Sequence, residues 1–173
     1  SPFSPCSRSL PKIAGDLRLR NALLIDRFAN YNQATTPLEE IIAIDPENRD
    51  ALSELKTIYT KKRAWSSLYA VLDKEAGLAS DPNARLALKV ELAKLAGDRL
   101  HHHGDAIKLW SEVVEEAPET EGAIDALLKL TEREKDWARH ASALEVAQGR
   151  EEDDKQRIKL LQRLGTTYGD HLS

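Results

Sequence analysis

The sequence contains no methionine and one cysteine, and it is poor in glycine, proline and aromatic residues. The single Cys6 has no intramolecular partner, which excludes a disulfide framework. No apolar run approaches the roughly 18 residues that a membrane-spanning helix requires, and the segment 1–11 lacks the apolar core of a signal peptide. The cellular compartment is therefore left undetermined. The missing methionine favours a processed protein or a segment cut from a longer one.

The charge balance excludes another class of function. Lysine and arginine number 25 against 29 acidic residues, which gives a net charge of -4. Without a basic excess to neutralise a phosphate backbone, nucleic-acid binding is not expected. Apolar residues make up 41% of the chain, and alanine, leucine, glutamate, lysine and arginine dominate it. This composition predicts an all-α protein with a substantial core.

Short motifs recur along the chain at a fixed spacing. Asp45-Pro46 returns as Asp81-Pro82 after 36 residues, and Trp65 returns as Trp137 after 72 residues. A constant period of this length is typical of stacked supersecondary units, none of which can bury its apolar face alone. The apolar residues follow a helical period, and the loops between them are short, which predicts antiparallel helical hairpins.

The sequence thus predicts an all-α, right-handed α-solenoid of about nine helices. Its first expected helix carries Leu17, Leu24 and Phe28 on one face. The expected organisation is a flexible lead-in at 1–14, then repeat units at about 15–46, 47–82, 83–118 and 119–152, with a partial unit at 153–173.

Several helix ends can also be predicted from local sequence. Thr36 is expected to cap a helix that has Pro37 in its first position and Glu39 completing a capping box. Asp81-Pro82 is expected to begin a later helix in the same way, and Asp45-Pro46 precedes another. The basic run 61–63 is expected to end a helix, and 101–104 is expected to form a turn.

The segment Leu164-Gly165-Thr166-Thr167-Tyr168 is similar to the L-G-x-x-Y signature of the tetratricopeptide repeat, a helix-turn-helix unit. Gly104-Asp105-Ala106-Ile107, followed by Trp110, Val113 and Pro118, resembles the second helix of that unit. The resemblance extends over residues 15–172. The sequence departs from the family where a small residue is expected, at Lys56, Leu68, Leu128 and His140.

The resemblance implies a scaffold that binds a partner polypeptide in a concave groove, without catalytic chemistry. The family's Lys-Asn carboxylate clamp is absent, because the matching groove positions are Ser53, Thr57, Val90, Lys94, Asp125, Lys129, Gln162 and Thr166. The residues expected to contact a partner protein or peptide are Thr57, Lys61, Lys94, Lys129, Arg133 and Thr166. The basic residues of this set could attract an acidic peptide. Asp50, Asp98 and Asp125 weaken the positive electrostatic potential around them.

Other candidate sites are better explained by packing or turn formation than by ligand binding. The run His101-His102-His103 suggests a metal, but consecutive side chains point in different directions, whereas a tetrahedral site needs converging ligands. The three tryptophans lie on apolar stripes, which favours packing. No catalytic motif is present. We therefore expect neither an enzyme nor a cofactor.

The last expected helix has no hairpin partner after it in this sequence, so we expect Ile158, Leu161 or Tyr168 to be left uncovered. Solenoids normally carry a polar end cap, which leaves two explanations: a longer array, or two copies that meet end to end. Three functions remain open at this stage. They are an interaction scaffold, a regulatory or substrate-binding domain of a multidomain enzyme, and a self-assembling structural element.

Overall fold

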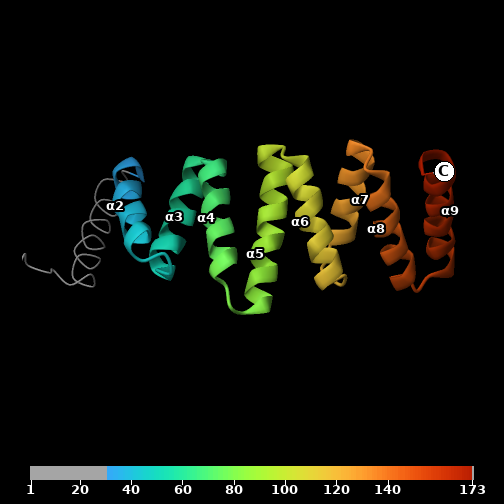
Figure 1. The fold of residues 1–173 in the computed structure, drawn as a ribbon, viewed down its shortest axis with the longest axis horizontal. Helices are drawn as coiled ribbons and strands as arrows, with labels where there is room; N and C mark the ends of the chain where they lie inside the picture. Colours follow the sequence, from blue (N-terminus) through green and yellow to red (C-terminus); the bar gives the residue numbers. More distant parts are fainter. Residues whose placement is uncertain (1–30, 173) are drawn as a thin grey trace, which may run out of the picture. The chain divides into compact units, whose positions relative to one another are not determined.

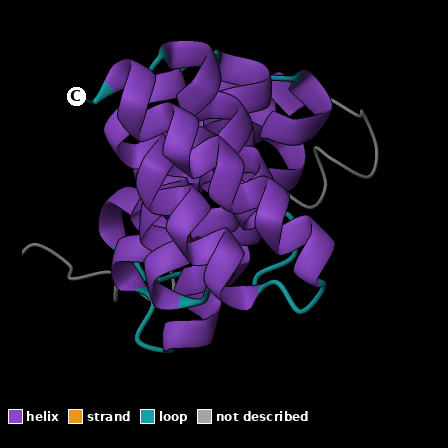
Figure 2. Ribbon diagram, turned by 90° about the vertical axis from the view of Figure 1, so that its right-hand side faces the viewer, coloured by secondary structure: helices purple, strands orange, loops and turns teal. Residues whose placement is uncertain are grey.

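The structure, a computed structural model, describes residues 31–172. In that range it contains eight α-helices and one π-helical turn, and no strand (Figure 2). The helix predicted around Leu17, Leu24 and Phe28 lies outside the described residues. The helices are α2 (Tyr31–Ile44), α3 (Arg49–Lys62), α4 (Trp65–Leu78), α5 (Pro82–Leu95), α6 (His103–Glu116), α7 (Ala123–Glu134), α8 (Trp137–Arg150) and α9 (Asp154–His171).

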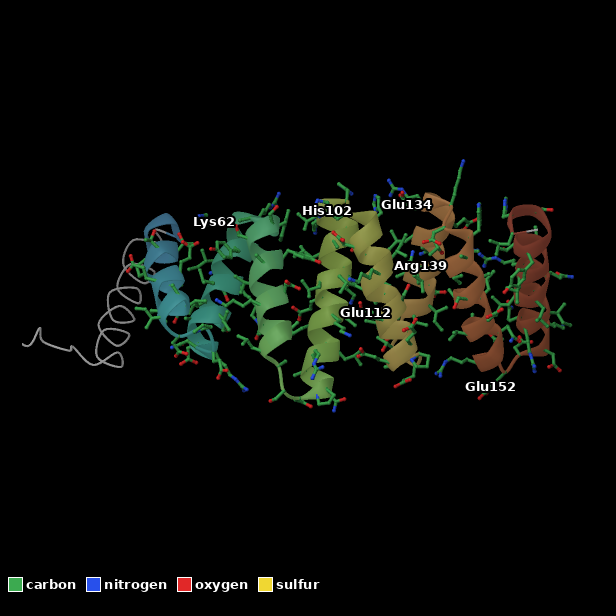
Figure 3. All side chains as sticks on the ribbon, viewed as in Figure 1. Lys62, His102, Glu112, Glu134, Arg139 and Glu152 are labelled. Atoms are coloured by element: carbon green, nitrogen blue, oxygen red, sulfur yellow. The ribbon has the colours of Figure 1, made fainter. Side chains whose placement is uncertain are left out.

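The chain divides into two compact units, residues 1–78 and residues 79–173, and each is described by itself. In the first unit, α2 packs against α3 and α3 packs against α4. In the second unit, each helix from α5 to α9 packs against the next one in the chain (Figure 1). His102 and Glu134 lie at one end of the helices of the second unit and Glu152 at the other, as expected for antiparallel neighbours (Figure 3). None of the described helices is both long and apolar enough to cross a bilayer.

The first unit is held together by an apolar core and a polar link between α2 and α3. Leu38 and Ile41 on α2 are fully buried. The Tyr59 hydroxyl on α3 donates a hydrogen bond of 2.5 Å to Oε1 of Glu39 on α2. Burial, followed by this hydrogen bond, raises the pKa of Tyr59 well above its usual value. The hydroxyl therefore stays protonated and can act as the donor that fixes α2 against α3.

The start of α2 differs from the prediction. The helix already includes Tyr31, and Pro37 lies inside it. Proline has no amide proton, so its position in the helix interior leaves one backbone carbonyl without its usual donor. The ring of Pro37 is among the fully buried side chains. Burial of the ring offsets part of that loss, and the Glu39 carboxylate is bound to Tyr59 rather than to a capping box.

The helix start at Asp81 is confirmed. Its carboxylate accepts hydrogen bonds of 3.2 Å from the amides of Asn83 and Ala84, with Pro82 in the first turn. In α3 the cap is instead Asn48, whose side chain accepts from the Ala51 amide. The two Asp-Pro motifs therefore have different local roles.

The first helix of each of three hairpins ends on a non-glycine residue in the left-handed conformation. These residues are Arg63, His101 and Lys135, with φ of 54°, 55° and 58°. The predicted end of α3 at its basic run is thus confirmed. A left-handed residue at this point satisfies free carbonyls of the last turn and reverses the chain.

The turn predicted at 101–104 is shorter than expected. After α5 the chain continues through a π-helical turn at Ala96–Leu100, and α6 begins at His103. A Cβ added at Gly97 would lie 3.6 Å from the Cβ of Ala106, which is an ordinary van der Waals contact. The turn therefore packs on α6 through small side chains.

Candidate functional site

The second unit carries an open groove between α5 and α7, with a volume of about 830 Å³. We call it the α5–α7 groove. Its floor consists of small and apolar side chains, and its rim consists of charged side chains. The floor residues include Ala93, Gly97, Trp110, Ala126 and Leu130, and the charged rim residues are Lys94, Asp98, Glu121, Asp125 and Lys129.

Two residues of the groove floor are part of the core. Trp110 on α6 is only 4% exposed, and Ala93 on α5 is fully buried. Small residues at Ala93 and Gly97 keep the floor low, and the indole of Trp110 lies beneath it with little of its surface exposed. An open hollow with a partly apolar lining can receive an apolar side chain of a ligand.

The rim carries charges of both signs in opposite orders on its two sides. On one side, Lys94 of α5 precedes Asp98 of the π-helical turn by four residues, and on α7, Asp125 precedes Lys129 by four residues. All four side chains are exposed. Residues four apart lie on the same helix face, so each wall presents one cation and one anion. Such a rim favours a ligand with charges of both signs over a purely acidic one.

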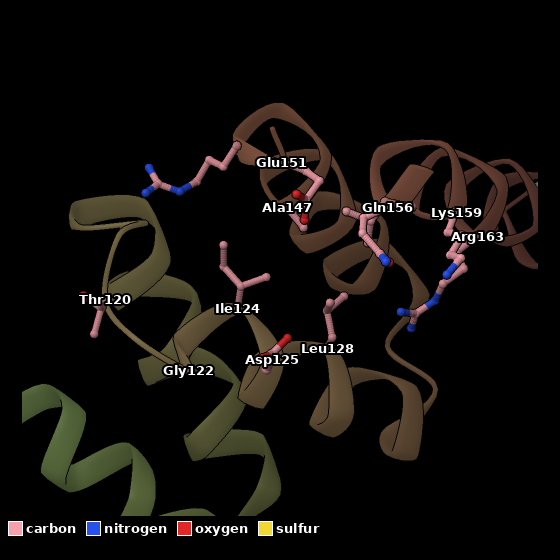
Figure 4. Close-up of a pocket in the computed structure, with 12 residues that line it drawn as sticks. Thr120, Gly122, Ile124, Asp125, Leu128, Ala147, Glu151, Gln156, Lys159 and Arg163 are labelled. Carbon is pink, nitrogen blue, oxygen red and sulfur yellow. The ribbon is translucent and has the colours of Figure 1, made fainter. Parts of the chain in front are cut away.

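A second groove of about 470 Å³ lies between α7 and α9 (Figure 4). We call it the α7–α9 groove. Ile124 and Leu128 of α7 form one side, and Lys159 and Arg163 of α9 form the other (Figure 4). The Arg163 guanidinium lies 4.0 Å from a carboxylate oxygen of Glu132. Asp125 lines this groove as well as the α5–α7 groove.

A further hollow, of about 410 Å³, lies in the first unit between α2, α3 and α4. Its lining is mainly apolar and includes Ile42, Leu52 and Leu55. The Tyr59–Glu39 hydrogen bond lies beside it and ties its walls together. Lys74 is the one cation in this lining, so it lacks the paired charges of the α5–α7 groove.

Two of the six predicted partner-binding residues come together in the structure. Lys94 and Lys129 line the α5–α7 groove from opposite walls. Arg133 is on the last turn of α7, outside both groove linings, with Nε 3.8 Å from Glu134. Thr57 and Lys61 are on α3 in the other unit.

Thr166 is exposed on α9 and lines neither groove. Its hydroxyl donates to the carbonyl of Gln162, one turn earlier. The side of α9 that faces α7 carries Lys159 and Arg163 instead. The predicted contact of Thr166 with a partner therefore stays a prediction. The pair Lys159 and Arg163, four residues apart, was not among the predicted site residues.

The tryptophans have different environments. Trp110 is buried, as expected for a core residue, whereas Trp65 and Trp137 are partly exposed. The Trp137 ring stacks on His171 of α9, with centroids 3.8 Å apart and planes 4° from parallel. This stack helps to fix α9 against α8.

The histidine cluster does not converge on a point. The rings of His101 and His103 are 6.0 Å apart, and Nδ1 of His102 lies 3.8 Å from Asp105. Among the described residues, no group of three histidine, cysteine, aspartate or glutamate side chains is arranged to hold a metal ion.

His140 has a packing role. It is buried, and its Nδ1 lies 3.0 Å from the Thr131 hydroxyl of α7. Burial, followed by the charge of Arg163, lowers the pKa of His140 below its usual value. The imidazole is thus kept neutral in a polar link between α7 and α8.

No model of a known protein family matches the sequence, and no curated protein matches it. Among solved structures, a MamA double mutant ("MamA RS-1 ArsTM double mutant") is similar, with a TM-score of 0.52 and 16% sequence identity. The match covers 94% of this chain and 88% of that chain. MamA has a tetratricopeptide-like fold, so this likeness, together with the all-helical structure, confirms the predicted fold class of tetratricopeptide-like helical hairpins.

Proposed function

We propose that this chain is a non-catalytic protein–protein interaction scaffold that binds an extended peptide segment in the α5–α7 groove. The carrying observation is the pairing of Lys94 and Lys129 on facing walls above a floor that contains Trp110. Repeat folds with parallel first helices line up such residues along one surface. Here both lysines belong to first helices of neighbouring hairpins.

The chemistry of the groove supports a peptide ligand. An apolar floor can take one or two side chains, while the exposed rim charges pair with the ligand at its edges. Lys94 with Asp98, and Asp125 with Lys129, place opposite charges one helical turn apart along each wall. A peptide with an apolar residue flanked by acidic and basic residues is the ligand that fits this arrangement.

The rim also supports a directional mode of binding. Each wall carries one lysine and one aspartate, and their order along the chain is reversed between the walls. Complementary charges set the register and orientation of a bound chain more than its total affinity. The groove is therefore expected to discriminate between a peptide and the same peptide with its charges exchanged.

A defined probe can test the proposal. A library of random dodecapeptides is selected on the immobilised chain, and binding of enriched peptides is measured by fluorescence anisotropy. The double variant Lys94→Glu with Lys129→Glu is expected to bind these peptides at least about tenfold more weakly, or about 1.4 kcal/mol. Replacing the acidic residues of the peptide by lysine is expected to restore binding to that variant.

The matched control is Lys108→Glu with Lys155→Glu, which makes the same change in net charge at exposed positions outside both grooves. It is expected to bind within about twofold of the unmodified chain. Equally weakened peptide binding in both double variants would show a general effect of net charge. Unchanged binding in the groove variant would refute the proposed site.

A further inference from the structure

The α7–α9 groove has the opposite balance of charge from the α5–α7 groove. The charged residues of its lining are three cations and two carboxylates: Arg150, Lys159, Arg163, Asp125 and Glu151. The α5–α7 groove has two lysines and three carboxylates, because Glu121 lines it in addition to the two aspartates of the rim. In a ligand that occupied both grooves, the segment in the α7–α9 groove would therefore be the more acidic one.

The three cations of the α7–α9 groove come from two helices. Lys159 and Arg163 are four residues apart on α9, so they lie on the same helix face, and both belong to the side of the groove opposite Leu128 of α7 (Figure 4). Arg150 is the last residue of α8. All three side chains are exposed, so a ligand can reach them from solvent. A peptide carboxylate in this groove can pair with a guanidinium in the bidentate geometry that arginine favours.

These cations are only weakly engaged by the chain itself. The Arg163 guanidinium lies 4.0 Å from a carboxylate oxygen of Glu132, and the two side chains are 48% and 62% exposed. A solvent-exposed pair at this distance contributes little to stability. Neither Arg150 nor Lys159 forms an ion pair with a described residue. A ligand carboxylate would therefore gain charge pairs here without breaking a strong internal one.

The bottom of the α7–α9 groove is apolar. Leu128 is 7% exposed, and Ile124, Ala147 and Leu160 are half-buried. A volume of about 470 Å³ lies within the usual range of ligand sites. The combination of this floor with the three cations suits an apolar side chain that has acidic neighbours in the ligand.

The α7–α9 groove lies on the side of α9 that faces the preceding helices. Its lining takes residues from α7, α8 and α9. The stack of His171 on Trp137 holds α9 against α8. The exposed side chains of Ile158 and Leu161 line neither groove. The groove therefore does not depend on what covers the other side of α9.

The two grooves adjoin at the start of α7. Thr120, Gly122 and Asp125 line both of them. Gly122 has a φ of 74° and is exposed, and a Cβ added there would meet no atom within 4 Å. A ligand can therefore pass close to the backbone at this point. The Asp125 carboxylate disfavours an acidic residue at the crossing, which leaves the acidic part of the ligand on the side of α9.

We propose that a single peptide occupies both grooves, crosses the start of α7 at Gly122, and places an acidic segment among Arg150, Lys159 and Arg163. This inference rests on the proposed peptide-binding function and specifies its ligand. The ligand class is a peptide in which the segment held by the α5–α7 groove is followed, at one end, by two or more acidic residues around an apolar one.

Lengthened peptides test the proposal on the full chain. The dodecapeptides selected on the unmodified chain are extended at either end by Glu-Leu-Glu, and their affinities are measured by fluorescence anisotropy. At one of the two ends the extension is expected to tighten binding at least about tenfold in low salt, and the gain is expected to shrink as salt is added. Extension by Lys-Leu-Lys, which has the same length and the same apolar residue, is expected to give no gain.

A double variant assigns the gain to the groove. Lys159→Gln with Arg163→Gln is expected to reduce the gain to at most about threefold and to leave binding of the unextended peptide within about twofold of its original value. The matched control is Lys155→Gln with Arg157→Gln, which removes the same charge from exposed positions of α9 outside both grooves. The control is expected to keep the full gain. Circular dichroism establishes that both variants keep their helices.

A nitroxide label tests the direction of the bound peptide. Attached to the Glu-Leu-Glu end, it is expected to broaden the amide NMR signals of α9 around Lys159. Attached to the opposite end, it is expected to broaden those of α5 around Lys94. The reverse pattern, or broadening of α5 by both labels, would contradict a peptide that crosses from one groove to the other.

The proposal is overturned if neither extension tightens binding, or if the gain survives in Lys159→Gln with Arg163→Gln. Binding of the unextended peptides reports separately on the α5–α7 groove, through Lys94→Glu with Lys129→Glu. If those peptides did not depend on Lys94 and Lys129, the proposed function would fail. The loss or retention of the gain would still decide whether the α7–α9 groove binds acidic residues.

Discussion

Helices α5 and α9 are 72 residues apart and occupy the same place in the repeat, yet the same face of each has a different environment. On α5 it carries the fully buried Ala93 and Ala96 and is covered by α6. On α9 it carries Leu161 and Tyr168, both more than 40% exposed. The covered face has small residues, and the uncovered one has large apolar residues.

The comparison shows that side-chain size on this face depends on the neighbour. Where α6 packs closely, alanine permits short interhelical distances, and the longer Lys89 reaches past the contact to Glu112 and Glu116. Where no helix of the described chain lies against the face, as on α9, large side chains extend outward. Large apolar groups exposed together are typical of an interaction surface.

The largest expected effect comes from the matched truncations Leu92→Ala and Leu164→Ala. Leu92 is 1% exposed, whereas Leu164, 72 residues later, is only half-buried. Leu92→Ala is expected to lower the free energy of unfolding by about 2–5 kcal/mol because it opens a cavity. Leu164→Ala is expected to cost about half as much or less. Chemical denaturation measures both, and equal losses would remove the distinction between the helices.

The next largest effect is expected from larger side chains on the compared face of α5 and α9. Ala93→Leu is expected to destabilise the chain by about 1–3 kcal/mol, because its side chain has no room against α6. The matched change Gly165→Ala has open space and removes a helix-interior glycine, so it is expected to stabilise by about 0.5–1 kcal/mol. Thermal unfolding of dilute samples measures the change in stability of both variants. A decrease in stability for Gly165→Ala would show that another group covers this face of α9.

A pH-dependent effect distinguishes the polar link of α7 and α8 from the charged link of α5 and α6. Burial lowers the pKa of His140 in the folded chain. As pH falls below about 6.5, the unfolded chain therefore binds a proton that the folded chain does not, and stability decreases. The loss levels off below the folded pKa.

The measurement compares denaturation midpoints at pH 7.5 and pH 5.5. His140→Gln is expected to show a smaller decrease than the unmodified chain, whereas His102→Gln, at an exposed position, is expected to show the same decrease. If His140→Gln left the pH dependence intact, the neutral imidazole would have no role in it.

The smallest expected effect is the loss of the α5–α6 ion pairs. The hydrogen bond to Glu116 raises the pKa of Lys89, so this side chain remains charged at neutral pH. Lys89→Gln is expected to cost about 0.5–1 kcal/mol in low salt and much less in 1 M salt. Lys108→Gln is the exposed control on α6, and an effect independent of salt would argue against an ionic contribution.

Features governed by periodicity and local capping could be predicted from the sequence. The Asp81 cap needs only a carboxylate beside two free amides, and the spacing of Ile158, Leu161 and Tyr168 is enough to place them on one face of a helix. Both depend on residues within a few turns of one another. Such local interactions are encoded in short stretches of sequence.

Tertiary packing determined what the sequence did not reveal. Pro37 reads as a first helical residue, but burial of its ring keeps it inside α2. The π-helical turn at Ala96–Leu100 contacts α6, and no local pattern in the sequence specified it. Trp110 in the groove floor and the side of α9 that faces α7 depend on how helices are rotated against each other. The rotation of each helix about its axis is set by long-range contacts, so it could not be predicted from an alignment of the repeats alone.

Hydrogen–deuterium exchange of the full chain at low micromolar concentration tests the difference between α5 and α9 most directly. If α5 is covered on this face and α9 is not, amides in the middle of α5 are expected to exchange at least about tenfold more slowly than those of α9. Equal protection of the two helices in dilute solution would contradict the account.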